Sequence, residues 1–191
     1  MSSDATFTAL LLEQTEQPDG KPSYSASVTE IESSRLPDGD VTVAVEFSSL
    51  NYKDGMILSG IGRLVTSYPH VPGIDLAGTV EASSHPDFAP GDRVVLTGYR
   101  VGEIWWGGYA SKAKVKGDWL VKLPQGLTTR QAMAVGTAGF TAMQALVALE
   151  QHGLTPGEPL LVTGASGGVG SSAVLWGALA GHHVVASTGR P

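Results

Sequence analysis

The stretch Leu160-Leu161-Val162-Thr163-Gly164-Ala165-Ser166-Gly167-Gly168-Val169-Gly170 decides the C-terminal fold of this 191-residue chain. Its apolar first part predicts a buried parallel strand. Three glycines spaced three residues apart follow, and then come a helix expected over residues 168–180 and a second strand over residues 183–187. This order of strand, glycine turn, helix and strand predicts one βαβ unit.

Glycines between a strand and a helix are typical of dinucleotide-binding turns. They let the backbone approach a pyrophosphate, and the helix N-terminus supplies N–H groups and the positive end of its dipole. The spacing here is G-x-x-G-x-x-G, not the usual G-x-G-x-x-G, and the alternative is a tight turn without a ligand. The cofactor-binding residues predicted in this turn are Gly164, Ala165, Ser166, Gly167, Gly168, Val169 and Gly170.

The end of the second strand bears on which dinucleotide binds. A carboxylate about 20 residues after the turn would bind the ribose 2′-hydroxyl of NAD. This chain has Ser187, Thr188, Gly189 and Arg190 there. Hydroxyls and a guanidinium suit a 2′-phosphate, so we predict NADPH as the cofactor and these four residues as part of its site. The alternative is that Arg190 is only a surface residue.

The N-terminal part has a different pattern, with short β-rich runs separated by Gly, Pro and Asp. Strands are expected over residues 7–12, 25–31, 41–48, 76–82, 93–96, 109–116 and 121–123. Val41, Val43, Val45 and Phe47 alternate and are predicted to share one face of their strand. Many short strands of this kind indicate a barrel or a sandwich.

The pattern changes after Pro124-Gln125-Gly126, where Thr128 and Gln131 form a capping-box pattern. A helix is expected from there to about residue 151, broken near Gly136. We therefore predict domains at 1–127 and 128–191. A dinucleotide-binding domain uses about six strands, so we expect the chain to be the front part of a longer protein. We also expect it to be poorly stable alone, unless another chain completes the sheet.

Composition excludes several classes of protein and site. Apolar residues make up 42% of the chain, and the net charge of −6 argues against nucleic acid or an anionic membrane as partner. Without a basic leader or any stretch of about 20 apolar residues, a cytoplasmic protein is expected. The absence of cysteine excludes disulfides and thiolate zinc sites. The histidines show no ligand spacing and are expected at surface or loop positions: His70, His85, His152, His182 and His183.

Several motifs occur in one order along the chain, and together they resemble the medium-chain dehydrogenase/reductase superfamily. They are residues 51–54 (Asn-Tyr-Lys-Asp), 71–78, 91–94, 107–110, 136–142 and the turn at 164–170. The resemblance is to the zinc-independent quinone oxidoreductase branch, and within it to the NADPH-dependent acrylyl-coenzyme A reductases. It implies a mixed α/β fold, with a GroES-like β-barrel followed by the first part of a Rossmann doubly wound parallel sheet. The cofactor would lie between the two.

The resemblance also implies a reaction without metal. Zinc enzymes of the family have Cys where this chain has Tyr52, and Gly-His-Glu where it has residues 73–75. Without zinc, the implied reaction is NADPH-dependent hydride addition to an activated C=C bond, as in acrylyl-CoA to propionyl-CoA. Quinone or enone reduction and a non-catalytic nucleotide-binding fragment are the alternatives.

Site residues in the N-terminal part and the central helix are implied in the same way. Tyr52 is the candidate near the nicotinamide, as cofactor-positioning residue or as acid, while Asn51 and Asp54 shape its loop. Thr137 and Thr141 would line the nicotinamide ribose or amide. Tyr99, Trp105 and Trp106 either shape the substrate entrance or pack against the barrel, and we favour packing. The full-length form is expected to be a homodimer.

Overall fold

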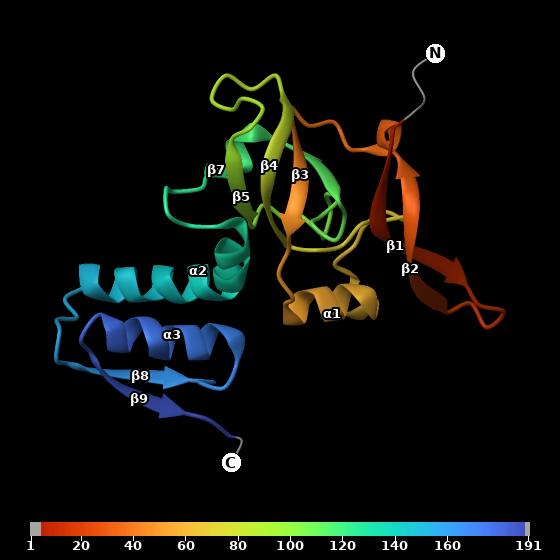
Figure 1. Cartoon of the computed structure of the whole chain (residues 1–191). Helices are drawn as coiled ribbons and strands as arrows, with labels where there is room; N and C mark the ends of the chain where they lie inside the picture. The colour runs from red at the N-terminus through yellow and green to blue at the C-terminus, as the bar shows by residue number, and fades with distance from the viewer. Residues whose placement is uncertain (1–4, 190–191) are drawn as a thin grey trace. The chain divides into compact units, whose positions relative to one another are not determined.

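The computed structural model describes residues 5–189, and its mixed α/β structure confirms the predicted class (Figure 1). The chain divides into two compact units, one ending at Ala134 and the other beginning at Val135. This division lies inside helix α2 (Thr129–Gln151), beside Gly136, whose backbone leaves the helical conformation at φ 50° and ψ −163°. The predicted break in this helix is thus confirmed. The domain boundary at 127/128 stays a prediction.

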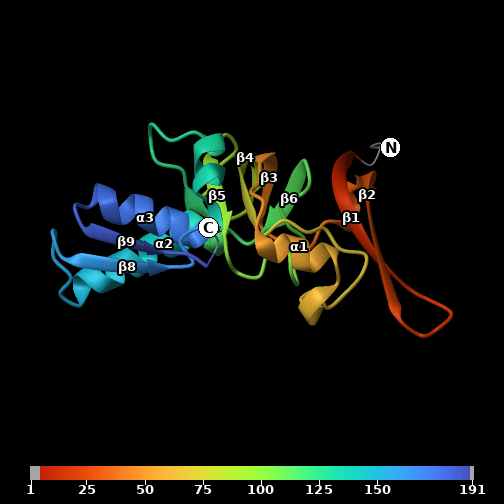
Figure 2. The same ribbon diagram turned by 90° about the horizontal axis from the view of Figure 1, so that it is seen from below.

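The first unit consists of a hairpin and an antiparallel sheet. Strands β1 (Thr6–Glu16) and β2 (Pro22–Glu32) form the hairpin. The sheet has the order β6-β3-β4-β5-β7, and Figure 2 shows its four longer strands side by side. Its strands are β3 (Val41–Phe47), β4 (Asp75–Ser83), β5 (Arg93–Thr97), β6 (Lys112–Val115) and β7 (Val121–Lys122). Helix α1 (Tyr52–Leu58) follows β3, and single 3-10 turns cover Ser33–Arg35, Ile61–Arg63 and Gly117–Trp119.

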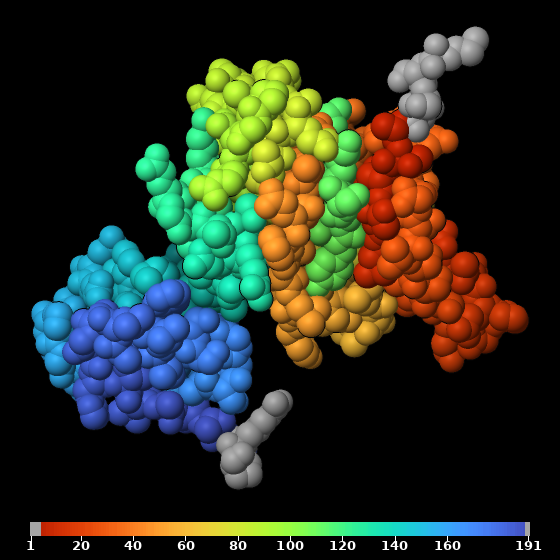
Figure 3. Space-filling model, in the orientation of Figure 1, coloured from red at the N-terminus to blue at the C-terminus, as the bar shows by residue number. Residues whose placement is uncertain are grey.

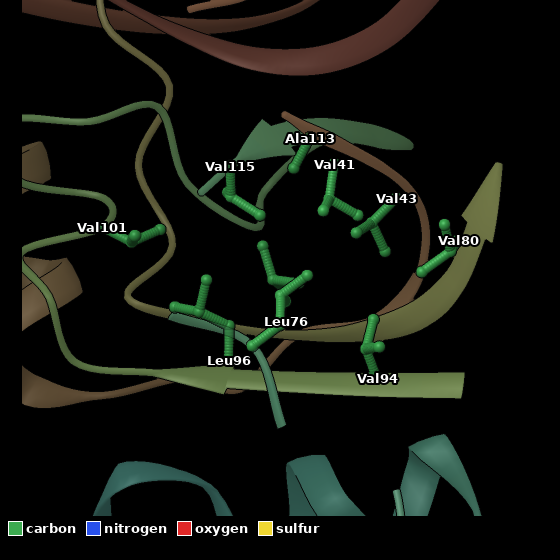
Figure 4. Close-up of a cluster of buried hydrophobic side chains, with 10 residues drawn as sticks. Val41, Val43, Leu76, Val80, Val94, Leu96, Val101, Ala113 and Val115 are labelled. Atoms are coloured by element: carbon green, nitrogen blue, oxygen red, sulfur yellow. The ribbon is translucent and has the colours of Figure 1, made fainter. Parts of the chain in front are cut away.

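Aliphatic side chains from four strands converge on one core. Figure 4 shows Val41, Leu76, Val94 and Val115 pointing toward one another from β3, β4, β5 and β6. All four are fully buried. Trp105 and Trp119 pack against the edge of this core, and the Trp105 ring N–H donates to the carbonyl of Lys114 at 2.8 Å. The packing interpretation therefore holds for Trp105.

The face predicted for strand β3 is correct at its start and wrong at its end. Val41 and Val43 are fully buried, but Phe47 is 42% exposed. The register with β4 shifts twice, between Thr42 and Val43 and between Val45 and Phe47. The first shift leaves an extra residue in β4, so Val41 and Val43 stay on one face, whereas the second leaves Glu46 as an extra residue in β3 and changes the side that Phe47 faces. The alternation of apolar residues in this part of the sequence did not indicate these shifts.

The second unit contains the predicted βαβ unit. Strands β8 (Pro159–Thr163) and β9 (His183–Ser187) pair in parallel, and helix α3 (Gly168–Leu179) joins them (Figure 1). A Cβ at Gly177 would come within 2.8 Å of Leu160 and 3.1 Å of Val184. This glycine therefore allows α3 to pack closely on both strands.

Helix α2 begins with the predicted capping box. The Thr128 N–H donates to Gln131 Oε1 at 2.9 Å, and the Gln131 N–H donates to Thr128 Oγ1 at 3.2 Å. Its 23 residues are long and apolar enough to span a bilayer by length and composition, which the sequence pattern did not lead us to expect. Core helices of soluble proteins pass the same test, and Gly136 interrupts this one. The finding is thus weak support for a membrane span.

His70 and His182 are buried, so a surface position is wrong for them, but both lie outside the helices and strands, as expected for loop positions. His70 exchanges two backbone hydrogen bonds with Leu12, at 2.7 and 2.8 Å, and its Nε2 lies 2.8 Å from the carbonyl oxygen of Gly102. Burial lowers the pKa of His70, although the hydrogen bond to Gly102 opposes this effect. His70 therefore joins two segments: its backbone bonds to strand β1, and its neutral ring bonds to the loop at Gly102.

A substitution at Gly78 tests whether β3 and β4 need a glycine at the point where their backbones come close together. A Cβ there would lie 1.9 Å from the carbonyl oxygen of Ala44. We expect Gly78→Ala to lower the free energy of unfolding by about 1–3 kcal/mol, several degrees in thermal midpoint. Gly55→Ala is the matched control, because Gly55 lies in α1, a Cβ there would have nothing within 4 Å, and alanine favours helix. Equal midpoints for the two variants would contradict this close approach.

The pH dependence of stability tests the burial of His70. Below about pH 6.5 the unfolded chain binds a proton at this ring that the folded chain does not, so stability falls as the pH falls. We expect His70→Gln to remove up to about 1.4 kcal/mol per pH unit of this slope between pH 7 and 5. Thermal midpoints over that range measure it. The exposed His152 serves as control, and a His152→Gln variant that flattens the slope as much would refute the assignment.

Candidate functional site

The start of helix α1 is fixed by a reciprocal cap. Asn51 is the N-cap, with extended backbone at φ −122° and ψ 157°, and its N–H donates to Asp54 Oδ2 at 2.9 Å. The Asn51 side chain in turn accepts from the backbone of Asp54, which completes the capping box. Asn51 and Asp54 therefore shape this loop, as the sequence suggested.

Asp54 also joins the helix to the sheet. Its side chain is fully buried, and its second oxygen accepts the Ile74 N–H at 3.0 Å. Ile74 directly precedes strand β4. One carboxylate thus accepts backbone N–H groups from Asn51 and from Ile74, which lies 20 residues after Asp54, and sets the position of α1 against β4.

A second buried carboxylate lies beside the first. Asp75 is fully buried, and its Oδ2 accepts hydrogen bonds from the Ser49 hydroxyl and, at 3.3 Å, from the Asn51 side-chain amide. The same amide lies 3.2 Å from Asp54 Oδ2. The Asn51 amide therefore bridges two carboxylates, which is a structural use of Asn51 that its motif did not reveal.

Tyr109, which lies 60 residues after Ser49 in the sequence, also contacts this cluster. Its hydroxyl donates to the Ser49 carbonyl oxygen at 3.1 Å. Burial raises the pKa of Tyr109, and the negative charges of Asp54 and Asp75 raise it further. The phenol is therefore held protonated at neutral pH. Tyr109 belongs to one of the family motifs, but nothing in its spacing pointed to Ser49.

Tyr52 contrasts with these neighbours. Its side chain is 88% exposed and stands at the first position of α1, next to the buried cluster. The following residue, Lys53, pairs with Glu103 at 3.0 Å, and Arg100 approaches the other Glu103 oxygen at 3.5 Å. The Glu103 side chain is only 10% exposed. Hydrogen bonds and ion pairs thus engage the residues next to Tyr52, while its own ring is exposed. Sequence reasoning missed Glu103, which lies 50 residues away.

The glycine turn of the second unit brings its own backbone atoms close together. A Cβ at Gly170 would lie 2.2 Å from the Gly164 carbonyl oxygen, so no other residue fits there without movement. Gly164 itself has φ +62°, and the Gly167 N–H donates to its carbonyl oxygen at 2.9 Å. Gly167 is the N-cap of α3. This turn brings backbone atoms together at a helix N-terminus, where anions are favoured.

The end of β9 lies against this turn. The Ala165 N–H donates to the Ser187 carbonyl oxygen at 3.1 Å, and the Thr188 hydroxyl donates to the Ser166 hydroxyl at 3.2 Å. The structure therefore brings together Ser166, Ser187 and Thr188, and their role in cofactor binding stays a prediction. Gly189 is exposed, and Arg190 lies outside the described residues.

The threonines predicted on α2 differ in exposure. Thr137 is half-buried and Thr141 is exposed. A Cβ at Gly168 would lie 3.3 Å from the Ala138 side chain, so this part of α2 runs beside the start of α3. Thr137 therefore directly precedes Ala138, whose side chain lies close to Gly168 in the glycine turn.

Possible metal ligands are scattered. Within residues 5–189, no group of three or more His, Asp or Glu side chains is placed to hold a metal ion. Asp54 and Asp75 are engaged by the hydrogen bonds described above. The expectation that no metal takes part stays a prediction.

The Asp54→Asn variant tests whether the two hydrogen bonds of the Asp54 carboxylate, to Asn51 and to Ile74, stabilise the fold. An amide offers one accepting oxygen, so either Ile74 or Asn51 would face an NH₂ group. We expect a loss of about 3 kcal/mol in unfolding free energy, measured by denaturant titration. Asp87→Asn removes a similar charge from an exposed side chain and should change the midpoint little. If both variants unfold alike, Asp54 is not an anchor.

Comparison with known proteins places both units in one family. Residues 37–125 match the family model of the alcohol dehydrogenase GroES-like domain. Over 186 residues the chain is 61% identical to the acrylyl-CoA reductase AcuI of Ruegeria pomeroyi, covering 97% of this chain and 56% of that protein. The chain thus spans about half the length of the curated relatives it matches.

Two solved structures are similar over nearly all of the chain. The yhdH oxidoreductase of Salmonella enterica, in complex with NADP, is 55% identical, with a TM-score of 0.88 over 96% of this chain and 55% of that one. Bacillus subtilis yhfP, with NAD bound, is 46% identical, with a TM-score of 0.89 over 98% of this chain and 56% of that one. With its GroES-like match and these relatives, the chain belongs to the medium-chain dehydrogenase/reductase superfamily.

Proposed function

We propose that this chain uses NADPH to reduce an activated carbon–carbon double bond, converting acrylyl-CoA to propionyl-CoA. The observation that carries the proposal is the glycine turn at α3, with the hydroxyls of Ser166 and Thr188 in contact beside it. It occurs in a chain 61% identical to an acrylyl-CoA reductase. The proposed partner is a small-molecule substrate, and we propose neither a nucleic acid nor a membrane as a partner.

The residues of the second unit fit a dinucleotide phosphate. The Gly164–Gly170 contact leaves no room for a side chain, so backbone N–H groups can approach a pyrophosphate. Ser187, Thr188, Gly189 and Arg190 supply hydroxyls and a cation for a 2′-phosphate, with no carboxylate among them. Because one relative is described with NADP and another with NAD, the 2′-phosphate is the feature to test. Thr137 and Thr141 complete the proposed cofactor site.

The chemistry is assigned to the first unit. When bound, the reduced nicotinamide supplies a hydride, which forms a C–H bond at the β-carbon while the C=C π bond breaks. A proton adds to the α-carbon. Tyr52 presents an exposed phenol that can hydrogen-bond cofactor or substrate, or supply that proton. Asn51 and Asp54 hold the helix that carries it.

Titration with NADPH and with NADH, followed by nucleotide fluorescence, tests the proposal. We expect the chain to bind NADPH clearly more tightly than NADH. Arg190→Gln should weaken NADPH binding about tenfold, because a guanidinium–phosphate pair contributes about 1.5–3 kcal/mol, and should leave NADH binding unchanged.

Arg130→Gln is the matched control, since Arg130 is exposed and the variant makes the same change of charge. Absence of binding by either nucleotide would show that these 191 residues do not form the site. Equal affinity for both nucleotides would overturn the assignment of the 2′-phosphate. NADPH-dependent turnover of quinones, but not of acrylyl-CoA, would favour the quinone reductase alternative.

A further inference from the structure

A hollow of about 680 Å³ in the first unit is unrelated to the glycine turn. It lies between the β1–β2 hairpin, including Gln14 and Glu16, and the segment from Arg63 to Tyr68. Figure 3 shows the hairpin, in red and orange, beside the gold segment that follows β3. Because all of its lining residues belong to one compact unit, the hollow is a feature of the first unit alone.

Two tyrosines form an aromatic wall of this hollow. The rings of Tyr24 and Tyr68 lie 6.0 Å apart at an angle of 49°. The Tyr24 ring lies against Gly60, where a Cβ would come within 2.0 Å of it, and Gln14 donates to the Tyr24 hydroxyl at 3.4 Å. Both rings also pack against the buried cluster of Leu12, Ile57, Val65 and Ile74. The wall is therefore firmly positioned before any ligand arrives.

Arg63 supplies a cation at the same hollow. Its side chain is exposed, and within residues 5–189 it makes no ion pair. Its backbone has φ 49°, which is uncommon for a residue other than glycine and is often retained at functional sites. Thr66 and Ser67 add hydroxyls beside it. An unpaired guanidinium with nearby hydroxyls is suited to a phosphate.

The hollow is connected to the proposed catalytic residue by one short helix. Ile57, near the end of α1, is buried in the cluster that supports the tyrosines, and Tyr52 begins the same helix. Seven helical residues span about 10 Å. A long substrate with its reacting end at Tyr52 could therefore place its far end near the hollow.

We infer that this hollow binds the phosphorylated adenosine end of an acyl-coenzyme A substrate, with the base against Tyr24 and Tyr68 and a phosphate at Arg63. The inference rests on the proposed function, because that function supplies the coenzyme A thioester. Aromatic side chains hold nucleic-acid bases by stacking on their faces, which shows how such a wall can hold adenine. Glu16 also lines the hollow, and its negative charge opposes a phosphate there.

Calorimetric titration with adenosine 3′,5′-bisphosphate tests the inference. The titration is made in saturating NADP⁺, so that the glycine turn is occupied. We expect Arg63→Gln to weaken binding about tenfold, and Glu16→Gln to strengthen it severalfold. Glutamine at position 63 carries the same backbone strain as arginine, and Arg130→Gln controls for the change in net charge. Tyr68→Leu should weaken the bisphosphate but not inorganic phosphate.

The outcomes separate this inference from the proposed function. If NADPH binds but the bisphosphate does not bind beside NADP⁺, or Arg63→Gln binds it as well as the unchanged chain, the hollow is not the site. If Arg130→Gln weakens binding as much as Arg63→Gln, only general charge is involved and the inference fails. Loss of NADPH binding itself would overturn the proposed function, whatever happens at Arg63.

Discussion

The buried carboxylate of Asp54 is the interaction on which the first unit depends. It accepts one N–H from the cap of α1 and another from Ile74 at the entry to β4. An isolated carboxylate in the interior would be strongly unfavourable, so its hydrogen bonds must be kept. Tyr52 lies in the same turn of helix, so these hydrogen bonds also set its backbone position, while its exposed side chain can contact a ligand.

The second unit depends on close backbone approach. Gly170 rests on the carbonyl of Gly164, and Gly177 allows α3 to lie on β8 and β9. The turn and its glycines could be predicted from the sequence, because the order strand–glycines–helix is local, whereas the packing role of Gly177 was not predicted. The same is true of the capping box at Thr128, whereas the one at Asn51 became apparent only in the structure. Local patterns therefore sufficed for the elements and for the motif residues.

What the sequence could not reveal depends on distant contacts. The register shift before Phe47, the carbonyl partner of His70 and the pairing of Lys53 with Glu103 all arise when strands and loops meet. Tyr109 reaches Ser49 across 60 positions. The hollow beside Arg63 is assembled from a hairpin and a loop that are far apart in the sequence. None of these has a periodicity or a spacing that marks it.

The most direct test of the proposed reaction measures which carbon of the product receives the hydride of NADPH. The chain is incubated with acrylyl-CoA and with NADPH in which both hydrogens on the nicotinamide C4 are deuterium, and the product is analysed by mass spectrometry and NMR. Hydride addition to the β-carbon predicts propionyl-CoA with one deuterium in its methyl group and a solvent proton at the α-carbon. Bound NADPH with no propionyl-CoA formed, or deuterium at the α-carbon, would contradict it.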